Sequence, residues 1–226
     1  MYNLDRPRTR PIVNWGLIAA NILFFLFELL YTHNLDAVPT ENLFLKLGLV
    51  PYYISSALNG VEVFRIGTLI TAMFLHAGVL HIAGNMLYLF VFGGKVEDAL
   101  GHARFLAFYV VSGIVAGLFQ VYLAAMSGPP EIYIPGIGAS GAISGVLAAS
   151  LIFFPRSRVV SVVGYFIVPV RALWFIGFWF VLQLLYSYFG VNSGVAYGAH
   201  LGGFAAGLMM GALARLIVGP TADEEL

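Results

Sequence analysis

Long apolar stretches constrain this chain more than any other feature of its sequence. A helix needs about 20 mostly apolar residues to cross the hydrocarbon core of a bilayer. Six segments approach or reach that length: residues 12–31, 78–93, 103–125, 138–154, 171–189 and 196–218. The whole chain is 60% hydrophobic and 10% charged, far more apolar than a soluble domain. The sequence therefore predicts an all-α polytopic membrane protein, with six transmembrane helices in one domain over residues 1–226.

The positions of the basic residues predict how these helices are oriented. If the N-terminus is cytoplasmic, every Lys and Arg except Lys46 and Arg65 lies on the cytoplasmic side, as the positive-inside rule requires. An even number of spans returns the C-terminus to the same side. We therefore expect residues 1–11 and 219–226 to be cytoplasmic, and the protein to reside in the cell membrane if its source is prokaryotic.

Two connections between the apolar segments are too apolar to be freely solvated linkers. Residues 33–77 contain many Leu, Tyr and Phe residues, so we expect this connection to lie in the membrane interface with its aromatic rings as anchors. Residues 156–170 have a similar composition on the cytoplasmic side, next to Pro155 and around Pro169.

Charge and residue usage exclude several functional classes. The formal net charge is +0 and no long basic run occurs, so nothing indicates a nucleic-acid partner. The chain contains no cysteine, which excludes disulfides, thiolate catalysis and cysteine metal sites. It also has no H-E-x-x-H motif, the usual sign of a zinc protease. We expect no metal and no cofactor, and the lipid bilayer itself as a partner.

A serine between glycines stands at the start of the fourth apolar segment. Ser140 lies between Gly138 and Gly141, and the N–H groups at a helix start can stabilise negative charge, so Ser140 is a candidate nucleophile. The pair Gly141 and Gly145 also matches the small-residue spacing that packs membrane helices together. Taken alone, this stretch favours helix packing over catalysis.

Polar residues on two other apolar segments fall at the depth of Ser140. In the predicted orientation the second, fourth and sixth segments all run inward from the outer face. His200 lies within about one turn of the outer end of the sixth segment. His81 and Asn85 are four residues apart near the outer end of the second, so they share a helix face. Independent packing residues would not need to coincide in depth.

The sixth segment carries a row of small residues of its own. Gly203 and Gly207 are four residues apart and form a small-xxx-small ridge. We expect this ridge to meet Gly141 and Gly145 at close range. Helix packing would then bring the histidine of one helix to the serine of the other.

The four polar residues match the needs of acyl transfer. Serine is a weak nucleophile until a base takes its proton, and histidine is the usual base near neutral pH, which gives Ser140 and His200 these roles. Asn85, His81 and backbone N–H groups can stabilise the oxyanion. No carboxylate falls at the same depth. The sequence therefore predicts a Ser-His dyad.

These residues resemble the motifs of the rhomboid family of intramembrane serine proteases. Residues 138–141 match the family's G-x-S-G, His200 after Ala199 matches its base, and His81 with Asn85 matches its oxyanion residues. Further matches are residues 64–65, 74–78 and 93–97. One position departs from the family pattern. Ser144 stands where members often carry an aromatic residue that stacks on the catalytic histidine.

The resemblance implies an intramembrane serine endopeptidase that cuts transmembrane segments of other membrane proteins near the outer face. Two alternatives remain open. A catalytically inactive rhomboid-like chaperone or scaffold would bind transmembrane helices without needing Ser140. A small transporter or channel would use buried polar residues such as Gln120, Gln183 and Glu28 to line a path, but charge is scarce in the spans and no internal repeat is visible.

Overall fold

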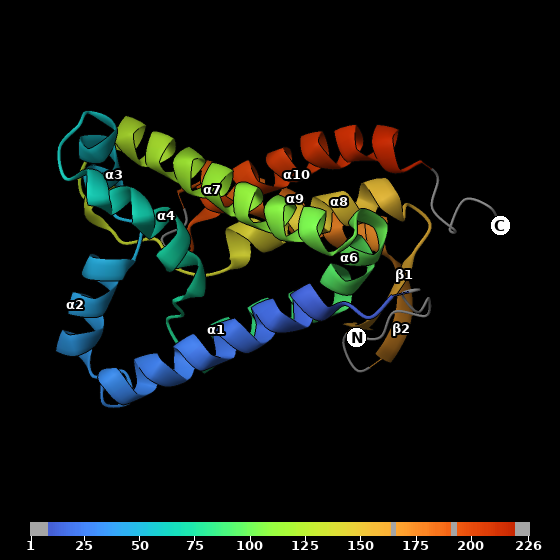
Figure 1. The fold of residues 1–226 in the computed structure, drawn as a ribbon, viewed down its shortest axis with the longest axis horizontal. Helices are drawn as coiled ribbons and strands as arrows, with labels where there is room; N and C mark the ends of the chain where they lie inside the picture. The colour runs from blue at the N-terminus through green and yellow to red at the C-terminus, as the bar shows by residue number, and fades with distance from the viewer. Residues whose placement is uncertain (1–8, 164–165, 191–193, 220–226) are drawn as a thin grey trace.

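The chain folds into a bundle of helices with one short β-hairpin, as a computed structural model shows (Figure 1). The structure describes residues 9–163, 166–190 and 194–219. Most of the predicted cytoplasmic segments, 1–11 and 219–226, lies outside the described residues. Helix α1 begins and helix α10 ends at the same end of the bundle, beside the hairpin (Figure 1).

Each of the six predicted apolar segments is helical. The helices are α1 (Ile12–Tyr31), α5 (Val79–Tyr88) with the π-helical turn η3 (Leu89–Gly93) and α6 (Gly94–Leu100), α7 (His102–Ser127), α8 (Ser140–Phe153), α9 (Ala172–Tyr188) and α10 (Tyr197–Val218). Four of them, counting α5, η3 and α6 as one continuous helix, are long and apolar enough to cross a membrane, whereas α8 and α9 are shorter. The prediction of a helical, polytopic membrane protein is confirmed.

The long connection after α1 is folded into short helices. They are α2 (Ala37–Leu47), α3 (Pro51–Leu58), η1 (Val63–Gly67), α4 (Thr68–Thr71) and η2 (Ala72–Phe74), and a further turn, η4 (Glu131–Tyr133), follows α7. Leu49, Ile54 and Leu69 pack with Val121 of α7 in a small apolar cluster. These short helices gather at the end of the bundle opposite the hairpin (Figure 1), and their place in the membrane interface stays a prediction.

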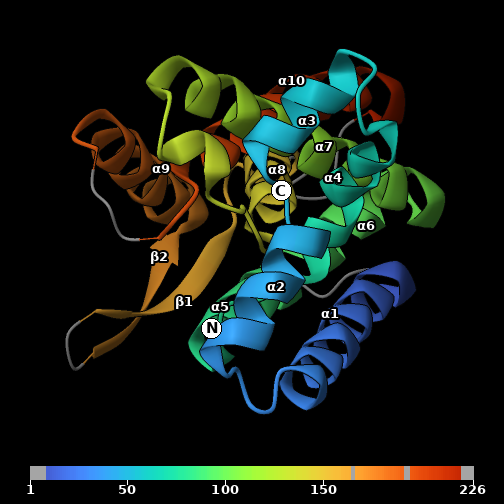
Figure 2. The same cartoon turned by 90° about the vertical axis from the view of Figure 1, so that its left-hand side faces the viewer.

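The second apolar connection forms a β-hairpin that the sequence analysis did not predict. Strand β1 (Arg158–Val163) pairs antiparallel with β2 (Phe166–Arg171), and Arg158 faces Arg171 at the open end. Runs of Val and Ile favour strands, but their high hydrophobicity led us to interpret the segment as an interfacial loop. Figure 2 shows the hairpin projecting from the bundle below α9.

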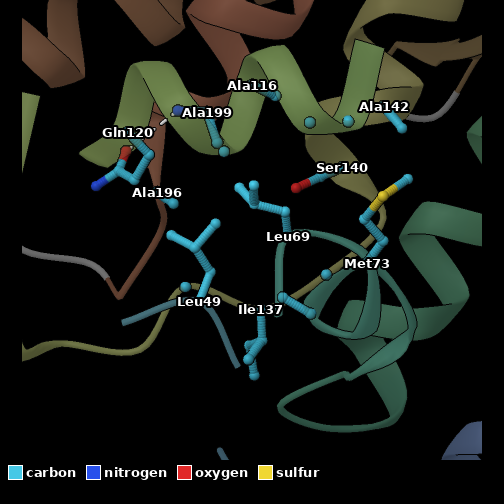
Figure 3. Close-up of a pocket in the computed structure, with 16 residues that line it drawn as sticks. Leu49, Leu69, Met73, Ala116, Gln120, Ile137, Ser140, Ala142, Ala196 and Ala199 are labelled. Carbon is cyan, nitrogen blue, oxygen red and sulfur yellow. Dashed lines mark hydrogen bonds between the residues drawn. The ribbon is translucent and has the colours of Figure 1, made fainter. Parts of the chain in front are cut away.

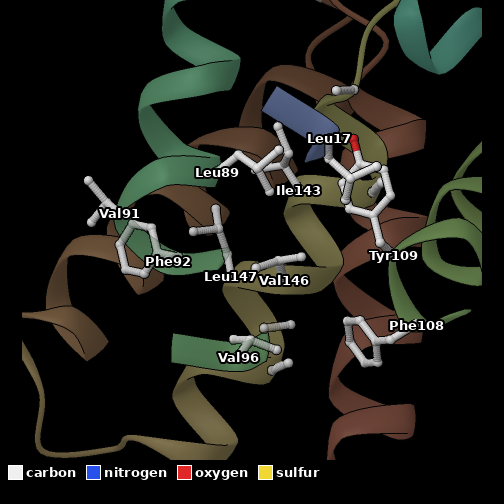
Figure 4. Packing of buried hydrophobic residues seen from close by; sticks show 14 of the residues in the cluster. Leu17, Leu89, Val91, Phe92, Val96, Phe108, Tyr109, Ile143, Val146 and Leu147 are labelled. Carbon is white, nitrogen blue, oxygen red and sulfur yellow. The ribbon is translucent and has the colours of Figure 1, made fainter. Parts of the chain in front are cut away.

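Helix α8 lies at the centre of the bundle. Nearly all of its residues are buried, and Figure 4 shows Ile143, Val146 and Leu147 enclosed by side chains from neighbouring helices. Small residues make this position possible, because glycine, alanine and serine let α7 and α10 approach closely. The central helix therefore begins with a half-buried Ser140 and continues as a buried segment from Gly141.

The outer surface of the bundle is apolar. Large hydrophobic side chains are exposed along α1, α9 and α10, among them Leu23, Leu30, Trp174, Phe178 and Leu216. An apolar surface of this extent suits contact with lipid tails and not with water. Large apolar residues therefore both fill the core and cover the outer surface of the bundle.

Candidate active site

Ser140 is the first residue of α8, and the turn before it is tightly anchored. The N–H of Gly138 donates to the carbonyl of Ala72 at 2.8 Å. Gly138 has φ of +114°, and a Cβ there would lie 2.8 Å from Nε2 of His81, so only glycine fits this position without strain. The first N–H groups of a helix have no partner within the helix, so the start of α8 offers free donors beside the Ser140 hydroxyl.

His200 reaches Ser140 from the first turn of α10. Its Nε2 lies 2.8 Å from Oγ of Ser140, within hydrogen-bond range, although the two residues are 60 positions apart. The histidine is 8% exposed. The two side chains predicted as nucleophile and base therefore meet in the geometry that proton transfer requires.

Helix α9 holds the other side of the His200 ring. Nδ1 of His200 lies 2.7 Å from Oε1 of Gln183, and the ring of Trp179 packs beside the imidazole with centroids 5.6 Å apart. Ser144 does not take this role, because its hydroxyl donates to the carbonyl of Ser140 at 2.7 Å. The sequence analysis treated Gln183 only as a possible pore residue. Its signal was a polar amide in an otherwise apolar helix.

Asn85 and His81 lie on α5 beside the same cavity as Ser140 and His200. This cavity has a volume of about 510 Å³ and is lined by all four side chains. Nδ2 of Asn85 is buried and has no hydrogen-bond partner among the described residues, so a donor is free at the site. Nδ1 of His81 accepts the N–H of Ala77 at 3.2 Å, which orients its Nε2 toward Gly138.

The turn before α5 is held by a buried carboxylate on α1. Both oxygens of Glu28 lie 3.2 Å from the backbone N–H of His76. The ring of His76 in turn packs edge-on against His81, with centroids 5.1 Å apart. Glu28 therefore supports the side chains around the cavity through the backbone and does not line it.

The predicted packing glycines bring α8 and α10 into backbone contact. A Cβ on Gly203 would overlap the carbonyl oxygen of Gly141, and a Cβ on Gly207 would overlap that of Gly145. Because neither helix has a side chain at these points, their axes can approach closely. This close approach sets the distance from α10 to the start of α8.

A second, smaller cavity lies on the other side of Ser140 (Figure 3). It has a volume of about 40 Å³ and is lined by apolar residues, among them Leu69, Met73 and Ile137. Gln120 lies at its edge and accepts the N–H of Ala199 at 3.1 Å. This bond ties the residue before His200 to α7.

The described residues contain no group of three or more His, Asp or Glu side chains that could hold a metal ion. The groups that surround Ser140 are instead a histidine base, amide and imidazole donors and free helix N–H groups. This set can activate a hydroxyl and stabilise an oxyanion. The arrangement is therefore suited to acyl transfer.

The sequence is similar to known proteins over most of its length. A family model described as the Rhomboid domain matches residues 62–216. Rhomboid protease AarA of Providencia stuartii is 30% identical over 202 residues, which cover 86% of this chain and 69% of that protein. RHOMBOID-like protein 6, mitochondrial, of Arabidopsis thaliana is 28% identical over 211 residues, covering 93% of this chain and 62% of that protein.

A human relative shows a shorter match. Presenilin-associated rhomboid-like protein, mitochondrial, of Homo sapiens is 30% identical over 143 residues, covering 63% of this chain and 33% of that protein. The chain thus spans less than two thirds of the length of both mitochondrial relatives. The similarity lies in the part of the chain that holds Ser140 and His200.

Proposed function

The chain belongs to the rhomboid family, and from this membership we propose that it is an intramembrane serine endopeptidase that cleaves transmembrane segments of other membrane proteins. The observation that carries the proposal is the 2.8 Å distance between Nε2 of His200 and Oγ of Ser140. The cavity of about 510 Å³ beside this pair offers room for substrate side chains. The similarity to AarA, whose name describes it as a protease, supports the same activity.

In this mechanism Ser140 is the nucleophile and His200 is first a base and then an acid. Nε2 takes the hydroxyl proton as Oγ bonds to the scissile carbonyl carbon. The imidazolium gives that proton to the leaving amine as the C–N bond breaks, and an acyl-enzyme remains. A water molecule then loses a proton to Nε2 and attacks the ester carbon. Oγ leaves, regains the proton and releases the new carboxyl terminus.

The oxyanion of each tetrahedral intermediate needs donors at the start of α8. We assign this role to the backbone N–H of Ser140, the ring of His81 and Nδ2 of Asn85, which has no hydrogen-bond partner among the described residues. Donors fixed before the reaction stabilise the developing charge without having to reorganise. The mechanism uses the side chains and backbone of this chain alone and needs no metal or cofactor.

We also propose that both termini are cytoplasmic and that cleavage occurs near the opposite, outer face, in the cell membrane if the source is prokaryotic. The distribution of Lys and Arg supports this orientation. Helix α1 begins and α10 ends at the same end of the bundle (Figure 1), which agrees with an even number of crossings. Ser140 begins α8 at the end of this helix that lies nearer to the short helices, since the N–H of Gly138 donates to the carbonyl of Ala72 in η2.

Cleavage of a reporter by the purified protein tests the proposal. The wild type, reconstituted in liposomes with a protein that has a single transmembrane segment, should cut that segment. Ser140→Ala and His200→Ala should reduce the rate by at least about 10³-fold. Ser150→Ala is the matched control, because Ser150 lies on the same helix and its hydroxyl, among the described residues, donates to the carbonyl of Leu147 one turn earlier. It should cleave normally.

A fluorophosphonate probe separates an enzyme from an inactive scaffold. The probe should label the wild type and Ser150→Ala but not Ser140→Ala. If the wild type neither reacts with the probe nor cleaves the reporter, the scaffold alternative replaces the protease. If Ser140→Ala cleaves as fast as the wild type, the nucleophile is wrong.

A further inference from the structure

Gln183 is a buried polar residue that the proposed mechanism has not used. It lies on α9 and is 7% exposed. Its Oε1 is 2.7 Å from Nδ1 of His200, the ring nitrogen on the far side from Ser140. The contact is a side-chain bond between two different helices, and it occupies the position that a carboxylate takes in a serine-protease triad.

The contact between Oε1 of Gln183 and Nδ1 of His200 decides which ring nitrogen carries the imidazole proton. A neutral imidazole carries one N–H donor and one acceptor nitrogen. An amide oxygen can only accept, so the bond to Gln183 requires the hydrogen to be on Nδ1 of His200. Nε2 then has its lone pair free, and it faces the hydroxyl of Ser140 at 2.8 Å. In the other tautomer Nε2 already holds a hydrogen and cannot take the serine proton.

We propose that Gln183 is a positioning residue that fixes His200 in the tautomer able to act as a base. This role rests on the proposed protease function. Gln183 also stabilises the imidazolium by accepting its Nδ1–H during the reaction. A neutral amide does this without placing a charge in the membrane interior, where a carboxylate is costly. The pair of Ser140 and His200 is therefore held in its reactive form by a third residue, Gln183.

A second residue of α9 supports the same ring. Trp179 is one turn before Gln183 and packs beside His200 at 5.6 Å between centroids, with planes tilted by 40°. Residues four apart share a helix face, so one face of α9 both contacts the ring and bonds to it. Position 144, one turn after Ser140 on α8, carries a serine that bonds within its own helix. The histidine therefore depends on α9 for its orientation.

Steady-state kinetics of two Gln183 variants test the proposal. Gln183→Leu replaces the amide with an apolar side chain of similar size and so removes the acceptor. We expect kcat to fall about 100-fold while KM stays within twofold. Gln183→Glu restores an acceptor, so it should recover most of kcat. The acidic limb of its pH–rate profile should move to higher pH, because a carboxylate stabilises the imidazolium.

A substitution elsewhere on α9 is the control for the Gln183 variants. Val181→Leu alters a half-exposed residue of the same helix and should leave kcat unchanged. The proposal fails if Gln183→Leu keeps kcat within twofold of the wild type. It also fails if Gln183→Glu loses as much activity as Gln183→Leu with an unmoved pH profile, since that pattern indicates packing alone.

A spectroscopic measurement makes the test independent of proteolysis. The chain has five histidines, so the ¹⁵N signals of His200 can be assigned in labelled protein by their loss in His200→Asn. At pH 8 the wild type should show a protonated Nδ1 and an unprotonated Nε2, and Gln183→Leu should move the proton toward Nε2. A wild-type proton on Nε2 overturns the inference. A protonated Nδ1 in a protein that cleaves nothing overturns the protease function and keeps the tautomer assignment.

Discussion

Ser140 and His200 meet where the backbones of α8 and α10 touch, whereas the far side of the His200 ring is held by side chains from α9. At the first contact a Cβ on Gly203 would overlap the Gly141 carbonyl, so the helices have no space to adjust. At the second, an amide and an indole support the ring. The distance between Ser140 and His200 is thus set by backbone packing, and the orientation of the imidazole by side chains.

The largest effect is expected from breaking the backbone contact. Gly203→Leu places a side chain against the Gly141 carbonyl, so α10 must move away from α8 and His200 must leave Ser140. A displacement of about 1 Å at a catalytic group can cost about 100-fold in rate, and kcat/KM for the reporter should fall at least that far. Unchanged cleavage would contradict the idea that packing sets the distance.

A substitution at Gly211, four residues after Gly207 on α10, is the control for Gly203→Leu. A Cβ at Gly211 would lie 3.3 Å from Cα of Ala149, a contact that a small shift relieves. Gly211→Ala should therefore keep at least half of the activity. Thermal unfolding in detergent should be followed for both variants, so that a loss of folded protein is separated from a loss of catalysis.

Weakening the side-chain support should have a smaller effect. Trp179→Ala removes the ring beside His200 but keeps the bond to Gln183. Contacts between aromatic rings contribute about 0.5 to 1.5 kcal/mol, so kcat should fall about 2-fold to 13-fold. The rate at which the fluorophosphonate probe labels Ser140 in the variant and in the wild type gives the same comparison without a peptide substrate. A loss as large as that of Gly203→Leu would show that both supports are equally rigid.

The smallest effect is expected at Ser144, where members of the family often carry an aromatic residue. The hydroxyl of Ser144 bonds to the carbonyl of Ser140 within α8, a local bond that contributes little to helix stability. Ser144→Ala should therefore change kcat/KM by less than twofold. A tenfold loss would indicate that Ser144 supports the catalytic pair directly, and the contrast between α9 and α8 would need revision.

Much of the fold follows from local sequence properties. Apolar length predicted all six main helices, and the prediction for α1 matches its observed bounds of Ile12–Tyr31. The hairpin was missed because a run such as residues 158–163 is as hydrophobic as a helix segment and too short for periodicity to distinguish the two. The depth of the polar residues grouped Ser140 with His200 because helix ends at one face of a membrane share a depth.

The role of Gln183 was beyond such reasoning. Its partner is on another helix, and nothing in the local pattern of α9 tells which of its faces turns toward α10. Asn85, whose Nδ2 has no partner among the described residues, is the opposite case. It lies four residues after His81, and this spacing alone predicted that the two side chains share a face of α5. Contacts within a helix can be predicted from spacing, but contacts between helices require the packing to be known.

Glu28 shows that residues before the family-model match help to hold the candidate site together. The part of the chain that matches the Rhomboid domain starts at residue 62, yet the carboxylate that secures the N–H of His76 comes from α1. A fragment that begins where the family-model match begins would keep Ser140, His200, Asn85 and His81 but lose the carboxylate that binds the N–H of His76. In this protein the family-model match and the folded unit therefore begin at different residues, and α1 lies outside the first and inside the second.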